Sequence, residues 1–361
     1  MPSPTQIKSV RFFRARSPIS QPIADATHTI SDMDFFITEI ETHGGVIGQG
    51  YLLSFHYFHR GIAGALRDMA DFLTQFEVHE TVRMAQEFAK ESEYFGHNGL
   101  LKWVQASFNI AMWDAWAKTL GQPIWKVLGS GPREVHVYGS GGWLSYTDDQ
   151  LVDEVVRYKN RGLGAVKIKV GAKEPGRDLH RLRKVREAVG PDLKIMMDAN
   201  QGMDVPSAIA LARAAQDIGI TWFEEPINHT DFAGYEAIRS KTGISLAMGE
   251  REFDLEPLKA LIARNALDLW QPDLLRIGGV EQWRDSAALA GAHHLPVLPH
   301  YYKDYDVPLL CTIPNGFGAE SFDWIDGLID NQMPIVNGKA RPRSGNGWGF
   351  SFLHSKMTEL T

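Results

Sequence analysis

The sequence predicts an α/β protein in which a small α+β domain precedes a (β/α) barrel. Residues 1–60 have the pattern of strands and turns, whereas residues 60–120 have that of amphipathic helices. After about residue 134, short apolar runs alternate with helical stretches. Nearly every one of these apolar runs ends in a charged or chelating residue, which is typical of a barrel with a site at its strand ends.

The N-terminal region favours an α+β arrangement. The segment ITEIETHGGVIGQGYLLSF (37–55) alternates apolar and polar residues around the turn signal HGG, so we expect a β-hairpin. The segments at 61–76 and 107–121 carry apolar residues at three- and four-residue spacing, and Gly121 ends the second. Strands followed by helices indicate a separate α+β domain.

Eight strand candidates follow, and helical segments such as 177–189, 205–218 and 281–292 separate them. The candidates lie at 136–140, 165–170, 194–200, 221–226, 245–250, 267–273, 296–300 and, more weakly, 316–320. This repetition is typical of a (β/α) barrel. A doubly wound open sheet is the alternative, but it would more often carry a glycine-rich phosphate turn after its first strand, and HVYGSGGW is a poor match.

Composition excludes several classes of protein. The net charge is −7, from 37 Lys+Arg against 44 Asp+Glu, and no basic tract appears, which argues against a nucleic-acid partner. The single cysteine, Cys311, excludes an intrachain disulfide and suits a reducing compartment. Without an apolar leader or a run of 18 apolar residues, no membrane partner is expected. We expect a cytoplasmic protein that acts on a small molecule.

The residues at the ends of the predicted strands are all polar, and each can bind a metal, transfer a proton or form a hydrogen bond. They are Lys167, Lys169, Asp198, Asn200, Glu224, Glu250, Asp273, His300 and Glu320. A single polar strand end could simply run into solvent. In a barrel, however, the carboxyl ends of all strands meet at one face, so seven consecutive polar ends favour a shared site.

Three carboxylates at neighbouring strand ends, Asp198, Glu224 and Glu250, cannot all stay ionised in a closed site without a counter-charge. Oxygen-only ligation indicates a hard cation, which points to Mg²⁺. Zinc is less favoured because no Cys or paired His joins the set. His293 and His294 are adjacent, which is not ligand spacing, and we interpret them as structural.

Two groups in the pattern are candidate bases. Lys167 and Lys169 are two residues apart on a strand, so both side chains should face the barrel interior and depress each other's pKa toward that of a general base. Ion pairs with the acids are the alternative. Asp273 is expected to orient His300. Bases on both sides of a metal-bound carboxylate indicate abstraction of an α-proton, with the metal stabilising the enediolate.

These residues fall in motifs that resemble the enolase superfamily, specifically its mandelate racemase subgroup. The motifs are KIK (167–169), MDAN (197–200), FEEP (223–226), MGE (248–250), QPD (271–273), GG (278–279) and PH (299–300). The resemblance implies a (β/α)7β modified TIM barrel at 131–325 and an N-terminal α+β capping domain at 1–130. It also implies that the C-terminal segment, 326–361, returns to the capping domain and completes it.

The resemblance also implies roles. Asp198, Glu224 and Glu250 would bind one Mg²⁺ per subunit, and Asn200 would lie beside the metal or the substrate. Lys169 would be the base on one face of the α-carbon and His300, supported by Asp273, the base on the other. Lys167 and Glu320 would contact the substrate carboxylate. Relatives of this kind assemble as homo-oligomers, usually dimers or octamers.

Glu225 is expected to point away from the metal by strand alternation and to pair with a neighbouring cation, such as a lysine.

Substrate contacts are expected from the loops of the capping domain. The first loop, 18–34, is polar, and its His28 is a candidate contact, as are Tyr57 and Ser140. The first loop also offers Asp25, Thr27 and Thr29; the second loop, around 51–60, offers Ser54, His56 and His59; and Lys303, Asp304 and Asp306 are expected at the pocket edge.

Such side chains suit a hydroxylated substrate and favour dehydration of a sugar acid, an aldonate or an aldarate, to a 2-keto-3-deoxy acid. Racemisation or epimerisation of a 2-hydroxy acid, cycloisomerisation of a sugar lactone or anhydro-sugar acid, and a barrel without turnover are the alternatives.

Overall fold

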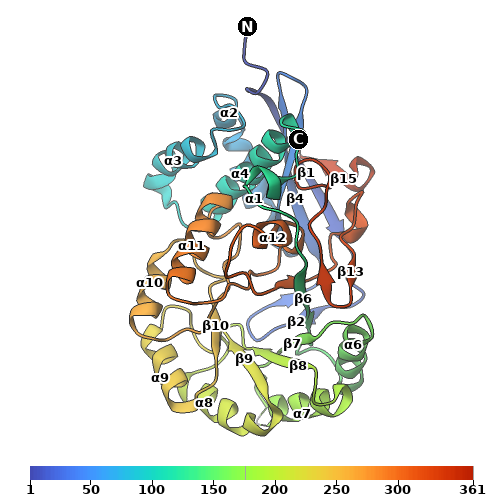
Figure 1. Ribbon diagram of the computed structural model, residues 1–361, viewed down its shortest axis with the longest axis vertical. Coiled ribbons are helices and arrows are strands. Elements are labelled where there is room, and N and C mark those ends of the chain that lie inside the picture. Colours follow the sequence, from blue (N-terminus) through green and yellow to red (C-terminus); the bar gives the residue numbers. More distant parts are fainter. Residues whose placement is uncertain (175, 361) are drawn as a thin grey trace.

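The computed structural model describes residues 1–174 and 176–360 and contains a capping domain above a barrel (Figure 1). In the capping domain β1 (Ile7–Ser17), β4 (Met33–Thr42) and β5 (Ile47–Ser54) form an antiparallel sheet. β4 and β5 are the predicted hairpin. β15 (Met357–Glu359) pairs with β1, so the sheet order is β15-β1-β4-β5 and the C-terminal segment does return to this domain.

Helices cover one face of this sheet and the loops beside it. The long helix α4 (Leu100–Thr119) packs directly on β5, because a Cβ at Gly48 would lie 2.3 Å from the Ala111 carbonyl oxygen. The remaining elements of the domain are α1 (His59–Asp68), α2 (Ala70–Leu73), α3 (Thr81–Ser92), α5 (Ile124–Val127) and the short hairpin β2 (Ile23–Ala24) and β3 (Thr29–Ile30). None of the helices in the described residues is both long and apolar enough to cross a bilayer.

The barrel is made of parallel strands in chain order. They are β6 (Val135–Gly141), β7 (Ala165–Lys169), β8 (Lys194–Asp198), β9 (Ile220–Glu224), β10 (Leu246–Met248), β11 (Leu269–Trp270) and β12 (Ala319–Ser321). Bridges from Trp270 to Val297 and from Asp273 to His300 place residues 297–300 beside β11, where the seventh strand was expected. A further bridge joins Val297 to Gly316, and β12 then pairs with β6, which closes the barrel.

Seven helices connect the eight positions, which is the expected (β/α)7β arrangement. They are α6 (Asp148–Asn160), α7 (Arg177–Val189), α8 (Val205–Ala214), α9 (Phe232–Thr242), α10 (Glu256–Ala263), α11 (Val280–Ala292) and α12 (Lys303–Leu310). In Figure 1 helices α6 to α10 form the outer layer of the lower half around strands β7 to β10.

Several strands are shorter than the sequence predicts. The expected strands at 267–273 and 296–300 contain Pro272 and Pro299, which have no N–H to donate to a strand ladder. β10 ends at Met248 because Gly249 follows with φ +139, and a Cβ there would lie 2.9 Å from the Trp270 ring. The polar residues beyond these strands therefore stand on irregular segments at the barrel mouth.

The barrel interior contains a small apolar layer of its own. Each of six barrel positions contributes one residue to it: Tyr138, Met196, Trp222, Ala247, Leu269 and Leu298. On β7 the neighbouring Val166 and Ile168 belong instead to the main core, so Lys167 and Lys169 face the interior as strand alternation predicts. Above the apolar layer the interior side chains are charged.

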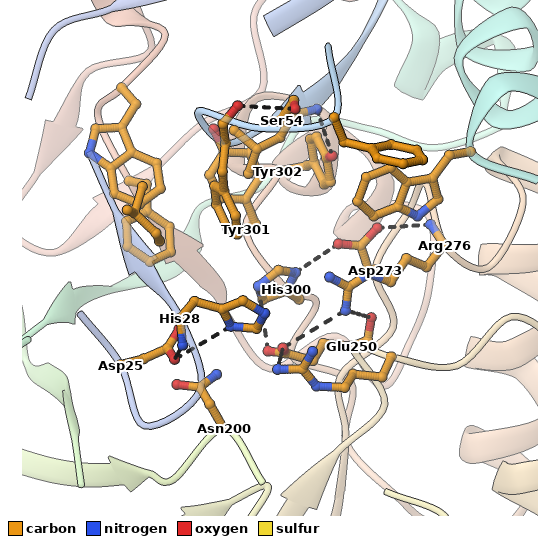
Figure 2. Close-up of a pocket in the computed structure, with 18 of the residues that line it drawn as sticks. Asp25, His28, Ser54, Asn200, Glu250, Asp273, Arg276, His300, Tyr301 and Tyr302 are labelled. Atoms are coloured by element: carbon orange, nitrogen blue, oxygen red, sulfur yellow. Dashed lines mark hydrogen bonds and ion pairs between the residues drawn. The ribbon is translucent and has the colours of Figure 1, made fainter. Parts of the chain in front are cut away.

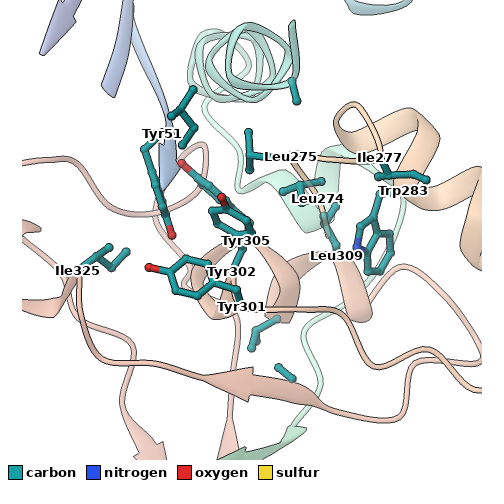
Figure 3. Close-up of a cluster of buried hydrophobic side chains, with 14 of the residues drawn as sticks. Tyr51, Leu274, Leu275, Ile277, Trp283, Tyr301, Tyr302, Tyr305, Leu309 and Ile325 are labelled. Carbon is teal, nitrogen blue, oxygen red and sulfur yellow. The ribbon is translucent and has the colours of Figure 1, made fainter. Parts of the chain in front are cut away.

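Aromatic packing and one carboxylate fix the capping domain on the barrel. Tyr51 of β5 packs against Tyr302 and Tyr305, with ring centroids 5.4 and 4.9 Å apart (Figure 3). Glu281, in the first turn of α11, accepts hydrogen bonds from Asn109 Nδ2 at 2.7 Å and Trp113 Nε1 at 2.9 Å, both on α4. The roof of the barrel mouth is therefore held in place by buried contacts.

Candidate active site

A cavity of about 350 Å³ lies between the carboxyl ends of the barrel strands and the capping domain. Five of the predicted site residues line it from the barrel side: Lys169, Asn200, Glu250, Asp273 and His300. His28 and Tyr57 line it from the capping domain. Figure 2 shows His300 between Asp273 and Glu250 at the centre of this group.

Beneath the cavity, both lysines are engaged with carboxylates. Lys169 Nζ lies 2.5 Å from Asp198 Oδ2, and Lys167 Nζ contacts Glu224 and lies 2.7 Å from Glu320 Oε1. All five side chains are buried. Ser140 pairs with Lys167 in the β6–β7 register, but it is not among the described residues that line the cavity.

The expectation that the paired lysines have depressed pKa values is wrong. Burial lowers the pKa of Lys169, and Lys167 lowers it further, but Asp198 and more distant carboxylates outweigh both and raise it. The pKa of Lys167 is also raised: burial opposes this, but Glu224 and Glu320 dominate. The two lysines instead form ion pairs with the acids, which is the alternative expected from the sequence.

The acidic donor set fits a hard divalent cation. Asp198 and Glu224 stand opposite each other in the β8–β9 register, and burial, together with other acids, raises the pKa of Glu224 to about 7 despite Lys167. Asn200 Oδ1 is buried, with no hydrogen-bond partner among the described residues. Within residues 1–174 and 176–360, no three acidic, His or Cys side chains converge as a ready ligand set, because lysines and arginines bind the carboxylates.

Glu250 is bound by three cationic side chains. Its carboxylate lies 3.4 Å from Arg251, 3.9 Å from Arg276 and 3.4 Å from His300 Nε2. Burial alone would raise the pKa of Glu250, but His300 and the two arginines hold it well below its usual range. A charge of this kind stays ionised and remains able to bind a cation.

His300 is oriented by Asp273. Its Nδ1 lies 2.7 Å from Asp273 Oδ2, while Asp273 Oδ1 accepts from the backbone N–H groups of Leu275 and Arg276, both at 2.9 Å. Burial lowers the pKa of His300, but Glu250 and the hydrogen bond to Asp273 raise it to about 9. The imidazole is thus positioned with Nε2 directed toward Glu250, and it is able to carry a proton.

Glu225 is not placed by strand alternation. It lies just past the end of β9 with φ +35, a left-handed backbone conformation. Arg251 Nε donates to its Oε2 at 2.9 Å, so its cationic partner is an arginine and not a lysine. Burial and the neighbouring Glu250 raise the pKa of Glu225, and Arg251 offsets part of that increase.

Residues 303–306 are not at the pocket edge, as the sequence had suggested. They belong to α12 and are buried. Lys303 Nζ lies 3.3 Å from Asp323, and Asp304 pairs with Arg343 at 2.5 Å. Asp306 is buried and does not line the cavity as far as the described residues show. Lys303 and Asp304 are thus used in ion pairs within the buried packing around α12.

Several residues that line the cavity were not predicted from the sequence. They are Arg251, Arg276, Trp143, Phe322 and Trp324. Each of Arg251, Trp143 and Phe322 closely follows a strand end, so the same position rule that selected the acids could have selected them.

Comparison with known proteins places this geometry in a family. Residues 7–129 match the model of the mandelate racemase / muconate lactonizing enzyme N-terminal domain, and residues 150–356 match that of the enolase C-terminal domain-like family. L-talarate/galactarate dehydratase from Salmonella typhimurium LT2 is 28% identical over 365 residues, which is 99% of this chain and 92% of that protein.

The crystal structure of that enzyme, liganded with Mg and L-lyxarohydroxamate, superposes with a TM-score of 0.92 at 27% identity over 98% of this chain and 94% of that chain. A 3,6-anhydro-alpha-L-galactonate cycloisomerase from Streptomyces coelicolor is 28% identical over 94% of this chain and 96% of its own length. Both domain models match in the expected order and together cover most of the sequence. The chain therefore belongs to the mandelate racemase / muconate lactonizing enzyme family of the enolase superfamily.

Proposed function

We propose that this protein is a Mg²⁺-dependent enzyme that removes the α-proton of a hydroxy-carboxylate, and that its reaction is the dehydration of a sugar acid to a 2-keto-3-deoxy acid. The observation that carries the proposal is the placement of two candidate bases, Lys169 and His300, in one cavity beside acids at neighbouring strand ends. Relatives that dehydrate sugar acids support the reaction class.

Asp198, Glu224 and Glu250 would hold the metal, with Asn200 Oδ1 beside them. When bound, Mg²⁺ supplies positive charge that stabilises an enediolate. Asp198 is the partner that raises the pKa of Lys169 most, so a role for Asp198 as a metal ligand would weaken that effect. Lys169 would act as the general base that accepts the α-proton.

His300 would act as the general acid, opposite to the base Lys169. With Asp273 bound to Nδ1, the imidazole would carry a proton on Nε2 and donate it to the departing β-hydroxyl. Asp273 fixes the ring and stabilises its charge. Lys167 and Glu320, joined at 2.7 Å below the cavity floor, would position the substrate carboxylate.

Racemisation or epimerisation is the second candidate, because bases on two sides of an α-carbon permit 1,1-proton transfer. Cycloisomerisation is the third, and the Streptomyces relative favours it. A panel of sugar acids, assayed for a semicarbazide-reactive keto product that is lost with EDTA, tests the dehydratase. Optical rotation that decays without keto acid would establish the racemase instead. If α-proton exchange in D₂O is absent across the panel, the enzyme proposal is wrong. A cytoplasmic homo-oligomer stays a prediction.

A further inference from the structure

The roof of the cavity is apolar. Among the side chains that line it from the capping domain are Ile30, Phe55, Phe58, Ile62, Leu100 and Trp103. They come from β3, from the loop after β5, and from α1 and α4. Lys169, Glu250 and His300 line the cavity from the strand ends, and Asp25 and His28 line it from the first capping loop. Away from that loop, the capping-domain side of the cavity is mainly apolar among the described residues.

One side wall is aromatic. Phe322 and Trp324 stack with ring centroids 4.3 Å apart and planes inclined by 18°, and Tyr301 stacks on Phe322 at 5.5 Å. Trp143 extends the stack beside Trp324 at 6.1 Å, and Lys169 Nζ lies 5.4 Å from the Trp143 ring centroid. Flat aromatic faces of this kind bind C–H surfaces of a substrate and offer no partner for an anion.

The polar side chains of the second capping loop are used within the capping domain. Ser54 Oγ donates to the carbonyl of Phe55 at 3.2 Å, and His59 Nε2 lies 3.0 Å from Asp34. The ring of His56 accepts from the Ser31 backbone N–H. These contacts fix the conformation of the loop. Ser54 also lines the cavity, where its hydroxyl can still accept a hydrogen bond.

In the first capping loop, Asp25 also binds groups of its own loop. Its Oδ1 accepts from the backbone N–H groups of Thr27 and His28, both at 2.7 Å (Figure 2 shows Asp25 beside His28). His28 remains at the cavity, with its Nδ1 shared with Thr27. The loop therefore brings one acid and one imidazole to the cavity.

No Lys or Arg from the capping domain is among the cavity-lining residues in the described part of the chain. The two arginines that line the cavity belong to the barrel and are already engaged. Arg251 binds Glu225 and Glu250, while Arg276 donates to the Glu250 carbonyl at 2.8 Å and packs over Trp103. Apart from His28 of the first capping loop, the described capping-domain residues offer an anionic group no cationic partner, and burial of an unpaired anion is unfavourable.

We infer that the substrate is a monocarboxylate whose end remote from the reacting carbons is apolar, such as a methyl-terminated hydroxy acid, and not a dicarboxylate. This inference rests on the proposed function. It separates this chain from the talarate/galactarate dehydratase relative, whose named substrates carry a carboxylate at both ends. The charged floor would hold the single carboxylate and its α- and β-hydroxyls, and the roof would cover the rest.

The test uses triads of sugar acids that share configuration at every stereocentre and differ only at the terminal carbon, which is methyl, hydroxymethyl or carboxylate. For each triad, kcat/KM is measured with Mg²⁺, and α-deuterium exchange is followed in D₂O. The methyl-terminated member should exceed the dicarboxylate by at least about 100-fold. Equal or better turnover of the dicarboxylate overturns the inference. If no member of any triad reacts or exchanges, the proposed function itself fails.

A charge-insertion variant tests the same point from the protein side. Leu100→Arg places a cation at the roof and should narrow the preference for the methyl-terminated acid over the dicarboxylate by about 10-fold or more. Val82→Arg adds the same charge at an exposed site on α3 and should leave the preference unchanged. Circular dichroism checks the fold of both. If a folded Leu100→Arg variant keeps the original ratio, the roof does not face the terminal group and the inference is wrong.

Discussion

Arg251 joins two glutamates that the strand pattern alone would separate: its Nε donates to Glu225 at 2.9 Å, and its guanidinium lies 3.4 Å from Glu250. Glu225 follows Glu224 directly, yet its backbone turns into the left-handed region and its side chain reaches the next strand end. Glu224 and Glu225 thus have different tasks. The first faces the barrel interior beside Trp222, and the second fixes Arg251 next to Glu250.

This relationship separates the two glutamates by experiment. Glu224→Gln should reduce Mg²⁺ affinity by more than about 100-fold, because it removes a ligand charge. Glu225→Gln should reduce it by about 10- to 100-fold, because it only loosens the group that orients Glu250. The affinity is measured by Mg²⁺ titration of turnover and of thermal stability. A larger loss in Glu225→Gln than in Glu224→Gln would reverse the assignment.

Removal of either candidate base should stop the reaction without unfolding the protein. Lys169→Ala and His300→Asn should each lower kcat by about 10²- to 10⁴-fold or more, as expected for lost general acid–base catalysis. His293→Asn, at the exposed end of α11, is the matched control and should leave kcat unchanged. Stopped assays and near-UV circular dichroism measure rate and fold. Full activity in Lys169→Ala would remove that residue from the mechanism.

Asp323 and Asp326 both pair with Lys303, and their contributions to the free energy of unfolding should change with pH in opposite directions. Burial raises the pKa of Asp326 to about 6, although Lys303 opposes the shift, so the folded state binds this proton more tightly than the unfolded state. Stability contributed by the protonated form is present below about pH 4 and is lost as pH rises to about 6. As the pH rises between these two values, the free energy of unfolding of Asp326→Asn should therefore come to exceed that of wild type by about 1 kcal/mol, after allowance for solvent screening.

Asp323 is the matched comparison for that experiment. Burial would raise its pKa, but Lys303 and Arg161 lower it, so its stabilising effect is present at neutral pH and is lost as pH falls below its ordinary value of 3.8. Asp323→Asn should destabilise the protein at pH 7. Urea unfolding of both variants at pH values from about 2 to 7 measures the difference. Parallel pH profiles for the two variants would contradict the opposite signs.

The hydrogen bonds that Glu281 accepts from the capping domain should contribute measurably to the free energy of unfolding. Glu281→Ala leaves Thr81, Asn109 and Trp113 without their shared acceptor and should cost about 2–4 kcal/mol of unfolding free energy. Glu236→Ala, which removes an exposed ion pair with Arg264, should cost less than about 1 kcal/mol. Chemical denaturation compares the two, and equal costs would show that the Glu281 contacts do not fix the domain.

The sequence predicted the barrel because its determinants are local in the chain. Apolar runs of strand length and helices such as 177–189 are periodic, and α7 begins and ends where the pattern does. Strand lengths were overestimated where Pro272 and Pro299 interrupt hydrogen bonding while the apolar pattern continues. Periodicity reports burial, and it does not report which N–H groups find a partner.

The candidate site was predictable in part for a similar reason. Strand ends of a barrel converge by construction, so Lys169, Asp198 and His300 could be grouped without coordinates. The ion-pair partners of each charged residue could not be predicted in this way. Lys303 and Asp304, for example, lie close to His300 in the sequence but belong to a buried helix. The polar residues of the capping loops were informative only in part: His28 and Tyr57 line the cavity as expected, whereas His59 pairs with Asp34 of its own domain.

The pairing of β1 with β15 joins Phe13 to Glu359 and so encloses nearly the whole barrel sequence between two strands of one sheet. During synthesis the outer edge of β1 stays unpaired until all eight barrel positions have left the ribosome. Because loop closure over such a distance is entropically costly, completion of this sheet should be a late event in folding. A nascent chain would thus complete the capping-domain sheet only after the barrel strands have been synthesised, although the roof residues precede the barrel in the chain.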